Sequence, residues 1–167
     1  MILDKLYKLI FFWVVSLVSA IIGYYLLWYI MPEHYVFGIW FRMFLYHYEH
    51  PIQYILIPCF FFGILATIFL EKFSRQILLK QLQILILISS ITILISSPFG
   101  GILWNYHDMQ AGYFPVNWFE KMVKNGIEMG LFMGWLIVAL SIPYNLLGLL
   151  TCFYIMKFGS NLFIKKQ

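Results

Sequence analysis

The sequence predicts an all-α integral membrane protein with four transmembrane helices, both termini in the cytoplasm, and an outer cap of aromatic-rich interfacial segments. Three observations predict this class. The 167 residues are 63% hydrophobic and only 11% charged, which is too little polar surface for a soluble domain of this length. Four long apolar runs follow one another along the chain. The Lys and Arg residues gather at the ends of those runs. We therefore treat residues 1–167 as one membrane domain.

The first two apolar runs cover residues 9–31 and 52–70. A membrane-crossing helix needs about 20 apolar residues, because the hydrocarbon layer is about 30 Å thick. The first run follows Lys5 and Lys8, as the apolar core of a signal peptide would. It continues, however, well past the ~7–15 residues of such a core. We expect it to stay in the protein as the first span.

The other two runs cover residues 80–97 and 127–156. The third run is short, and the sequence Pro98-Phe99-Gly100-Gly101 predicts a turn that ends it. The fourth run is longer than the bilayer requires. Pro143 interrupts it, so we expect a kink or a tilt there.

The count of Lys and Arg predicts which side of the membrane holds the termini. Four spans place both termini and the loop 71–80 on one side. That side carries eight of the eleven basic residues: Lys5, Lys8, Lys72, Arg75, Lys80, Lys157, Lys165 and Lys166. The other side carries Arg42, Lys121 and Lys124. Because cytoplasmic loops are enriched in Lys and Arg, we expect cytoplasmic termini, and the small, plain architecture suggests a bacterial plasma membrane. The scattered basic residues argue against nucleic acid as a partner.

Two outer segments, 32–51 and 98–126, are rich in Tyr, Phe and Trp. Aromatic side chains favour the boundary between lipid and water, so both segments are expected to fold down as an interfacial cap. In the second segment, Asn117 is a plausible N-cap with Glu120 three residues later. This pattern predicts a short helix that Asn125-Gly126 ends or bends.

All four histidines fall on the outer side, together with several carboxylates. His47 and His50 are three residues apart, which places them on one face of a helix. If these side chains converge, they form a transition-metal site for Zn²⁺, Cu²⁺ or Fe²⁺. The predicted ligands are His34, His47, His50, His107, Glu49 and Asp108. The plainer interpretation is a set of polar residues at the water boundary. No nucleophile motif accompanies His107-Asp108, so no catalytic residue is assigned.

A small-residue stripe, Gly126, Gly130 and Gly134, opens the fourth run. Glycines at this spacing let another helix approach closely, either within the chain or from a partner. Two polar residues lie in the same run. If Glu128 lies below the lipid headgroups, it needs an interaction partner. Pro143 leaves a backbone carbonyl without its helical hydrogen bond, and Asn145 is expected either to donate to that carbonyl or to contact a neighbouring span.

Three functions are compatible with these patterns. The first is a small non-enzymatic subunit, an accessory, assembly or regulatory partner of a membrane protein complex or a homo-oligomer, because the loops are short and no catalytic signature is present. The second is an outer-face metal-binding membrane enzyme or metal-handling protein that uses the histidines and carboxylates. The third is a small transporter component, although the spans contain almost no ionisable residue that would mark a transport path.

Overall fold

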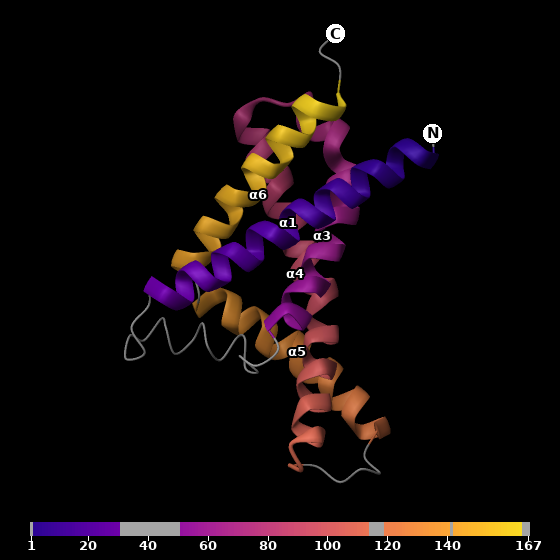
Figure 1. The fold of residues 1–167 in the computed structure, drawn as a ribbon, viewed down its shortest axis with the longest axis vertical. Coiled ribbons are helices and arrows are strands. Elements are labelled where there is room, and N and C mark those ends of the chain that lie inside the picture. The colour runs from indigo at the N-terminus through magenta and orange to yellow at the C-terminus, as the bar shows by residue number, and fades with distance from the viewer. Residues whose placement is uncertain (1, 31–50, 114–118, 141, 165–167) are drawn as a thin grey trace.

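The structure is a computed structural model, and it describes residues 2–30, 51–113, 119–140 and 142–164. Within these ranges the chain is all-helical, as the sequence predicts. The helices are α1 (Ile2–Ile30), α3 (Pro51–Ser74), α4 (Leu78–Gln110), α5 (Phe119–Leu140) and α6 (Ile142–Phe163) (Figure 1). Four stretches are long and apolar enough to cross a membrane: Leu3–Ile30, Pro51–Ser74, Leu78–Gln110 and Asn145–Phe163. The predicted number of candidate spans is therefore confirmed.

These stretches are helical because lipid offers the backbone no hydrogen-bond partner, so each span must satisfy its own N–H and C=O groups. The first turn of α1 adds local support. Lys8 Nζ lies 2.8 Å from Asp4 Oδ2, one turn earlier, and Asp4 sits at the electropositive start of the helix. Pro58 lies inside α3 without ending it. Such prolines are tolerated in membrane helices, where neighbouring groups satisfy the freed carbonyl.

The structure corrects the predicted turn at Pro98–Gly101. Helix α4 runs through these residues without a break and ends only at Gln110. At these residues α4 packs against Gly126 and Gly130 of α5, with almost no space between the two backbones. A turn here would break that contact and leave buried backbone groups without partners, whereas keeping the helix gives up only the N–H bond that Pro98 lacks. Residues 98–110 of the predicted outer segment therefore belong to α4.

Helix α4 is terminated by Gly112, two residues beyond its last helical residue, which was not predicted from the sequence. Gly112 has φ +83°, a conformation that side chains other than glycine's rarely adopt. The Tyr113 N–H donates to the Asp108 carbonyl at 3.0 Å, and the Gly112 N–H donates to the Met109 carbonyl at 3.1 Å. These two bonds are the Schellman arrangement, which satisfies the last carbonyls of a helix.

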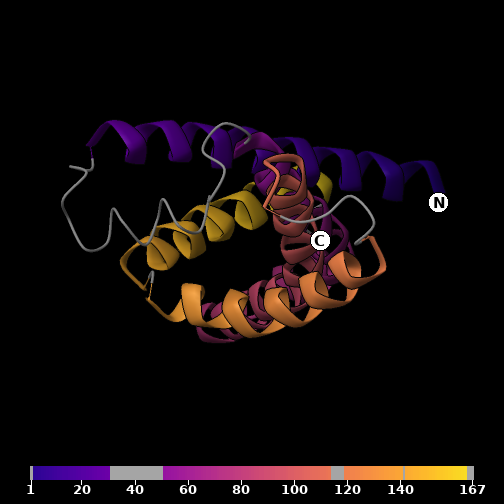
Figure 2. The same cartoon turned by 90° about the horizontal axis from the view of Figure 1, so that it is seen from below.

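The fourth apolar run is divided between two helices. Helix α5 continues through Asn125 and Gly126, and α6 begins at Ile142, one residue before Pro143. Proline is tolerated in a first turn because the N–H it lacks would have no intrahelical partner there. The fourth candidate span, Asn145–Phe163, thus lies further along the chain than the predicted 127–156. Seen from below, α1 and α5 lie on opposite sides of the molecule (Figure 2).

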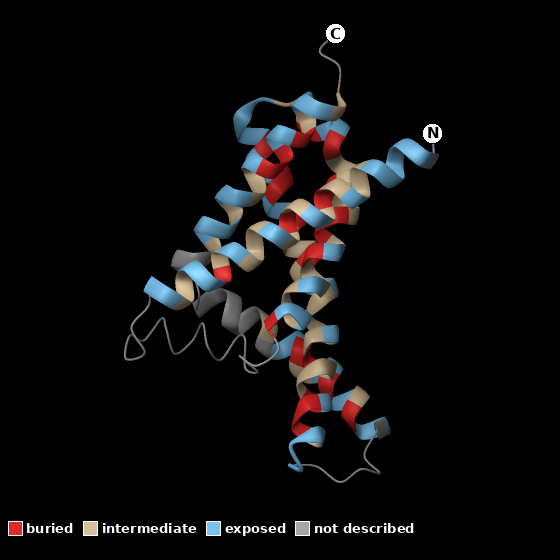
Figure 3. Cartoon of the chain, in the orientation of Figure 1, coloured by how far each residue is buried: buried red, intermediate tan, exposed pale blue. Residues whose placement is uncertain are grey.

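The apolar core lies where α1, α3, α4 and α6 meet, near the end that carries both chain termini (Figure 3). Its buried members are Phe12, Phe62, Ala66, Leu70, Phe73, Ile84, Leu85, Ile88, Ile155 and Met156. Helix α1 docks through two consecutive residues. A Cβ built on Gly63 would lie 3.1 Å from the Trp13 backbone nitrogen, and one on Gly159 would lie 2.6 Å from Phe12 Cε1. Two glycines therefore allow α1 to cross α3 and α6 closely.

Candidate functional site

Only part of the predicted metal site can be located. His107 and Asp108 lie in the last turns of α4. The other predicted ligands, His34, His47, Glu49 and His50, lie outside the described residues, as do residues 32–50 of the first outer segment and Asn117. Within the described ranges, no three His, Cys, Asp or Glu side chains gather in a way that could hold a metal ion.

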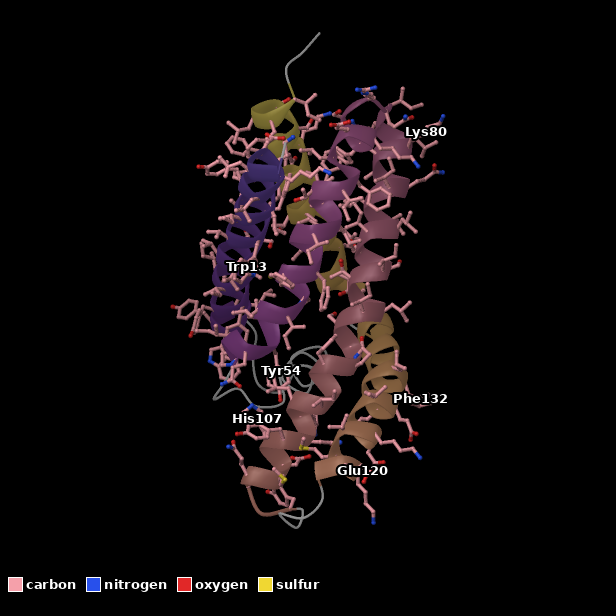
Figure 4. All side chains as sticks on the ribbon, turned by 90° about the vertical axis from the view of Figure 1, so that its right-hand side faces the viewer. Trp13, Tyr54, Lys80, His107, Glu120 and Phe132 are labelled. Atoms are coloured by element: carbon pink, nitrogen blue, oxygen red, sulfur yellow. The ribbon has the colours of Figure 1, made fainter. Side chains whose placement is uncertain are left out.

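His107 is buried, and its imidazole joins α4 to the first turn of α3. His107 Nε2 lies 3.0 Å from Gln53 Oε1. An amide oxygen only accepts hydrogen bonds, so Nε2 carries the proton in this contact. Two aromatic rings enclose the imidazole: the ring centroids of Tyr54 and Tyr106 lie 6.0 Å and 5.7 Å from it. Tyr54 and His107 lie beside each other near one end of the molecule (Figure 4).

The neighbours of His107 extend the contact to α5. Asn105 is 5% exposed, and its Nδ2 donates to the Met122 carbonyl at 3.1 Å. Asp108 is also buried. On the exposed side, Gln110 Nε2 donates to the Tyr106 hydroxyl at 2.7 Å. We call Gln53, Tyr54, Asn105, Tyr106, His107 and Asp108 the His107 cluster. It holds the end of α4 between α3 and α5, and its hydroxyl, amide, imidazole and carboxyl groups are the chemistry available there.

The predicted glycine stripe lies against α4 of the same chain. A Cβ on Gly126 would lie 2.7 Å from Ile102 Cα, and a Cβ on Gly130 would lie 3.0 Å from Pro98 Cα. One on Gly134 would lie 2.9 Å from Ser97 Cβ. The lack of a side chain at these three positions therefore lets the two backbones touch at Gly126 and Gly130 and lets the Ser97 side chain lie against Gly134. This packing is internal to the chain.

The two polar residues of the fourth run lie away from this contact. Glu128 is exposed, on the side of α5 that does not face α4. Asn145 is half-buried in the first turn of α6 and has an interaction partner.

A second polar contact, at the opposite end of the bundle, was missed by the sequence interpretation. Gln81 is 4% exposed, its Nε2 donates to the Phe73 carbonyl at 3.1 Å, and its Oε1 accepts from Lys157 Nζ at 3.3 Å. One side chain thus ties the end of α3, the start of α4 and the end of α6. A signal was present, because Gln81 precedes Ile84, Leu85 and Ile88 at the spacing of a single buried face.

Gln53 was also missed, and the sequence carries little that would reveal it. It is a single exposed amide at the start of an apolar run, and its partner lies 54 residues away. Gly101 carried a clearer signal. Where two membrane helices touch, small residues are expected on both helices, and Gly101 is the small residue that α4 places against the glycines of α5.

Comparison of the sequence and fold with protein-family models, curated proteins and solved structures gives no match.

Proposed function

We propose that the chain is a non-enzymatic subunit of a membrane protein complex in a bacterial plasma membrane, with both termini in the cytoplasm. The observation that carries the proposal is the outward face of α1. Exposed apolar side chains follow this helix along its length: Leu3, Leu6, Tyr7, Ile10, Val14, Val18, Ile22, Tyr25, Leu26, Tyr29 and Ile30. Many are three or four residues apart, so they form a continuous stripe on one side of the helix.

Only a small fraction of the residues in each candidate span is buried by other parts of the chain. In the most apolar stretch of each span, 17–28% of the residues are buried. Much of α1 and α6 is exposed along its length (Figure 3). Lipid tails cover part of such faces, but close packing of neighbouring helices is what holds membrane assemblies together. Helices that expose a long apolar face and bury few residues within their own chain are what we expect of a subunit that packs against other membrane helices.

The distribution of charge supports the proposed orientation. The start of α1, the turn between α3 and α4, and the end of α6 lie at the same end of the molecule (Figure 1). Their basic residues are Lys5, Lys8, Lys72, Arg75, Lys80 and Lys157. The start of α5, at the other end, carries Lys121 and Lys124. An excess of Lys and Arg marks the cytoplasmic side.

Site-specific photo-crosslinking in native membranes tests the proposal. A photoreactive residue at Val14 or Val18, both on the α1 stripe, is expected to capture the same membrane protein. The matched control is Leu87, which is exposed to a similar degree on α4. A product of twice the chain's mass would identify a second copy as the partner. A monomer in mild detergent that forms no crosslink from either α1 position would contradict the proposal.

The buried pair His107-Asp108 favours a second candidate function, a metal-binding membrane enzyme or metal-handling protein on the outer face. Imidazole and carboxylate groups are the expected ligands for Zn²⁺ or Fe²⁺. Elemental analysis of gently purified protein tests it. A stoichiometric transition metal that is lost in His107→Ala supports this function, and metal-free wild-type protein from metal-supplemented cells overturns it.

A further inference from the structure

Helix α4 is too long to lie wholly within a bilayer. It has 33 residues, which is about 50 Å of helix, whereas the hydrocarbon layer is about 30 Å thick. Lys80 in its first turn is exposed and marks one boundary. From Gln81 to Tyr106 the chain contains no ionisable side chain other than Tyr106 itself. Counting about 20 residues from Lys80 places the second boundary close to Gly100, well before the helix ends.

Helix α5 gives an independent boundary. Its charged side chains, Glu120, Lys121, Lys124 and Glu128, are all exposed and all lie in its first half. Beyond them, exposed side chains become apolar: Leu131 is 39% exposed and Phe132 is 76% exposed. Exposed charges avoid hydrocarbon, and exposed apolar groups avoid water. The hydrocarbon layer therefore begins between Glu128 and Leu131.

The glycine crossing shows that these two boundaries are at the same level. Gly126 lies against Gly101 and Ile102, and Gly130 lies against Ser97 and Pro98. The membrane boundary found on α5 therefore lies at the level of residues 97–102 of α4. The boundary counted from Lys80, close to Gly100, is at the same level. Helix α1 gives a similar thickness for the hydrocarbon layer. Its exposed Tyr7 and Tyr25 are 18 residues apart, which is about 27 Å along the helix. Exposed tyrosines favour the two interfaces of a membrane.

We infer that the lipid headgroup layer meets the protein at the glycine crossing, where Gly126 and Gly130 of α5 lie against residues 97–102 of α4. Beyond that level, residues 103–110 of α4 and 119–128 of α5 stand in the headgroup layer and water as a two-helix arm, which the first turn of α3 contacts through Gln53 and His107. The arm is held by the close glycine contact, by the bond from Asn105 Nδ2 to the Met122 carbonyl, and by the hydrogen-bonded end of α4 at Gly112. The inference rests on membrane residence and does not depend on the proposed complex.

This position explains why the arm's interior is polar. Asn105, His107 and Asp108 are all buried between helices. Burying an imidazole and a carboxyl group inside the hydrocarbon layer would cost several kcal/mol for each group, and the cost falls sharply at the headgroup level, where water reaches. The apolar core of the chain, by contrast, lies within the membrane-spanning part near Ile84 and Ile88.

Spin labels measure the depth directly. In a Cys59→Ala, Cys152→Ala background, single cysteines replace exposed residues on each side of the inferred boundary: Tyr106 and Lys124 outside, Leu94 and Phe132 inside. The labelled proteins are placed in phosphatidylcholine vesicles, and collision rates with oxygen and with a water-soluble nickel chelate are compared. Oxygen concentrates in hydrocarbon, and the chelate stays in water. We expect a high oxygen-to-nickel ratio at Leu94 and Phe132 and a drop at Tyr106 and Lys124.

Ratios at Tyr106 and Lys124 as high as those at Leu94 would overturn the inference, because the arm would then lie in hydrocarbon. Low ratios at all four positions would instead contradict membrane residence itself. Circular dichroism and a single elution peak verify that each variant is folded. If one variant does not fold, Ala111 and Ile95, which are exposed on the outer and inner parts of the chain, provide a second pair.

Discussion

Gly101 of α4 faces Gly126 of α5 with the two backbones in contact. A Cβ atom on Gly101 would overlap the carbonyl oxygen of Gly126, and a Cβ on Gly126 would lie 2.8 Å from the Ile102 nitrogen. Such proximity allows Cα–H groups to contact carbonyl oxygens across the helices, a weak attraction that recurs in close helix pairs. Because the atoms in contact belong to the two backbones, this contact leaves no room for a side chain at either position.

Replacing Gly101 by Ala is therefore expected to separate α4 from α5. The added methyl group meets backbone atoms, which cannot move aside as a side chain can, so the cost should be about 1–3 kcal/mol or more. Thermal unfolding in detergent measures the loss of stability, and faster amide exchange in α5 should accompany it.

The adjacent glycine is the matched control. A Cβ on Gly100 would meet nothing within 4 Å, so Gly100→Ala adds a methyl group to the same helix without a clash. It should leave stability unchanged or raise it by up to about 1 kcal/mol through better helix propensity. Equal effects of the two substitutions would contradict the close approach of α4 to α5 at Gly101.

The hydrogen bond between His107 and Gln53 should contribute measurably to the packing of α3 on α4. A double-mutant cycle with His107→Ala and Gln53→Ala is expected to give a coupling of about 0.5–1.5 kcal/mol in unfolding free energy. Gln83 on the exposed side of α4 is the control partner, since its substitution should be additive with His107→Ala within about 0.5 kcal/mol. A coupling of zero for His107 and Gln53 would show that this hydrogen bond does not stabilise the packing of α3 on α4.

Gln81→Leu is expected to destabilise the end of the bundle near the termini. Leucine fits the apolar surroundings, but Lys157 loses its contact with Gln81, and the Phe73 carbonyl keeps only the Gln76 N–H at 3.3 Å. Each lost hydrogen bond is worth about 0.5–1.5 kcal/mol. Chemical unfolding in detergent measures the effect, and Gln83→Leu, on the exposed side of the helix, should change stability by no more than about 0.5 kcal/mol. If the two variants unfold alike, the Gln81 contact contributes nothing.

Gly112 should tolerate Asn better than Ala. Its φ of +83° strains any residue with a Cβ by about 1–2 kcal/mol, and Asn reduces this strain by local hydrogen bonding. Gly112→Ala is therefore expected to loosen the last turn of α4, which carries His107 and Asp108. Amide exchange at Tyr113, whose N–H bonds to the Asp108 carbonyl, reports the loosening. Protection that is the same in the Ala and Asn variants would argue against the left-handed conformation.

The chain's all-helical character and its number of candidate spans were predictable because they depend on local hydropathy. The end of the third span was not. Pro98 followed by Gly100 and Gly101 is a local pattern that usually ends a helix. In the folded chain, residues 97–102 pack against Gly126 and Gly130 of α5, so α4 continues to Gln110 and Gly112 terminates it.

The candidate site was predictable only in part. His107 and Asp108 stand out as ionisable residues in an apolar chain, and composition is enough to select them. Their setting depends on residues that no local pattern connects. Gln53 becomes a partner of His107 only because α3 and α4 are antiparallel, and Asn105 becomes a partner of Met122 only because α5 returns along α4.

The sequence by itself determined that the chain is helical and apolar enough to reside in a membrane, because transfer of side chains from water to lipid depends on each residue separately. Only the tertiary structure decided which surface each helix presents. The spacing of Gly126, Gly130 and Gly134 predicts that another helix approaches closely. The same spacing would serve a neighbouring helix of this chain or a helix of a partner protein. Contact between α4 and α5 assigns the stripe to the chain itself, because the identity of a packing partner depends on where both helices lie in space.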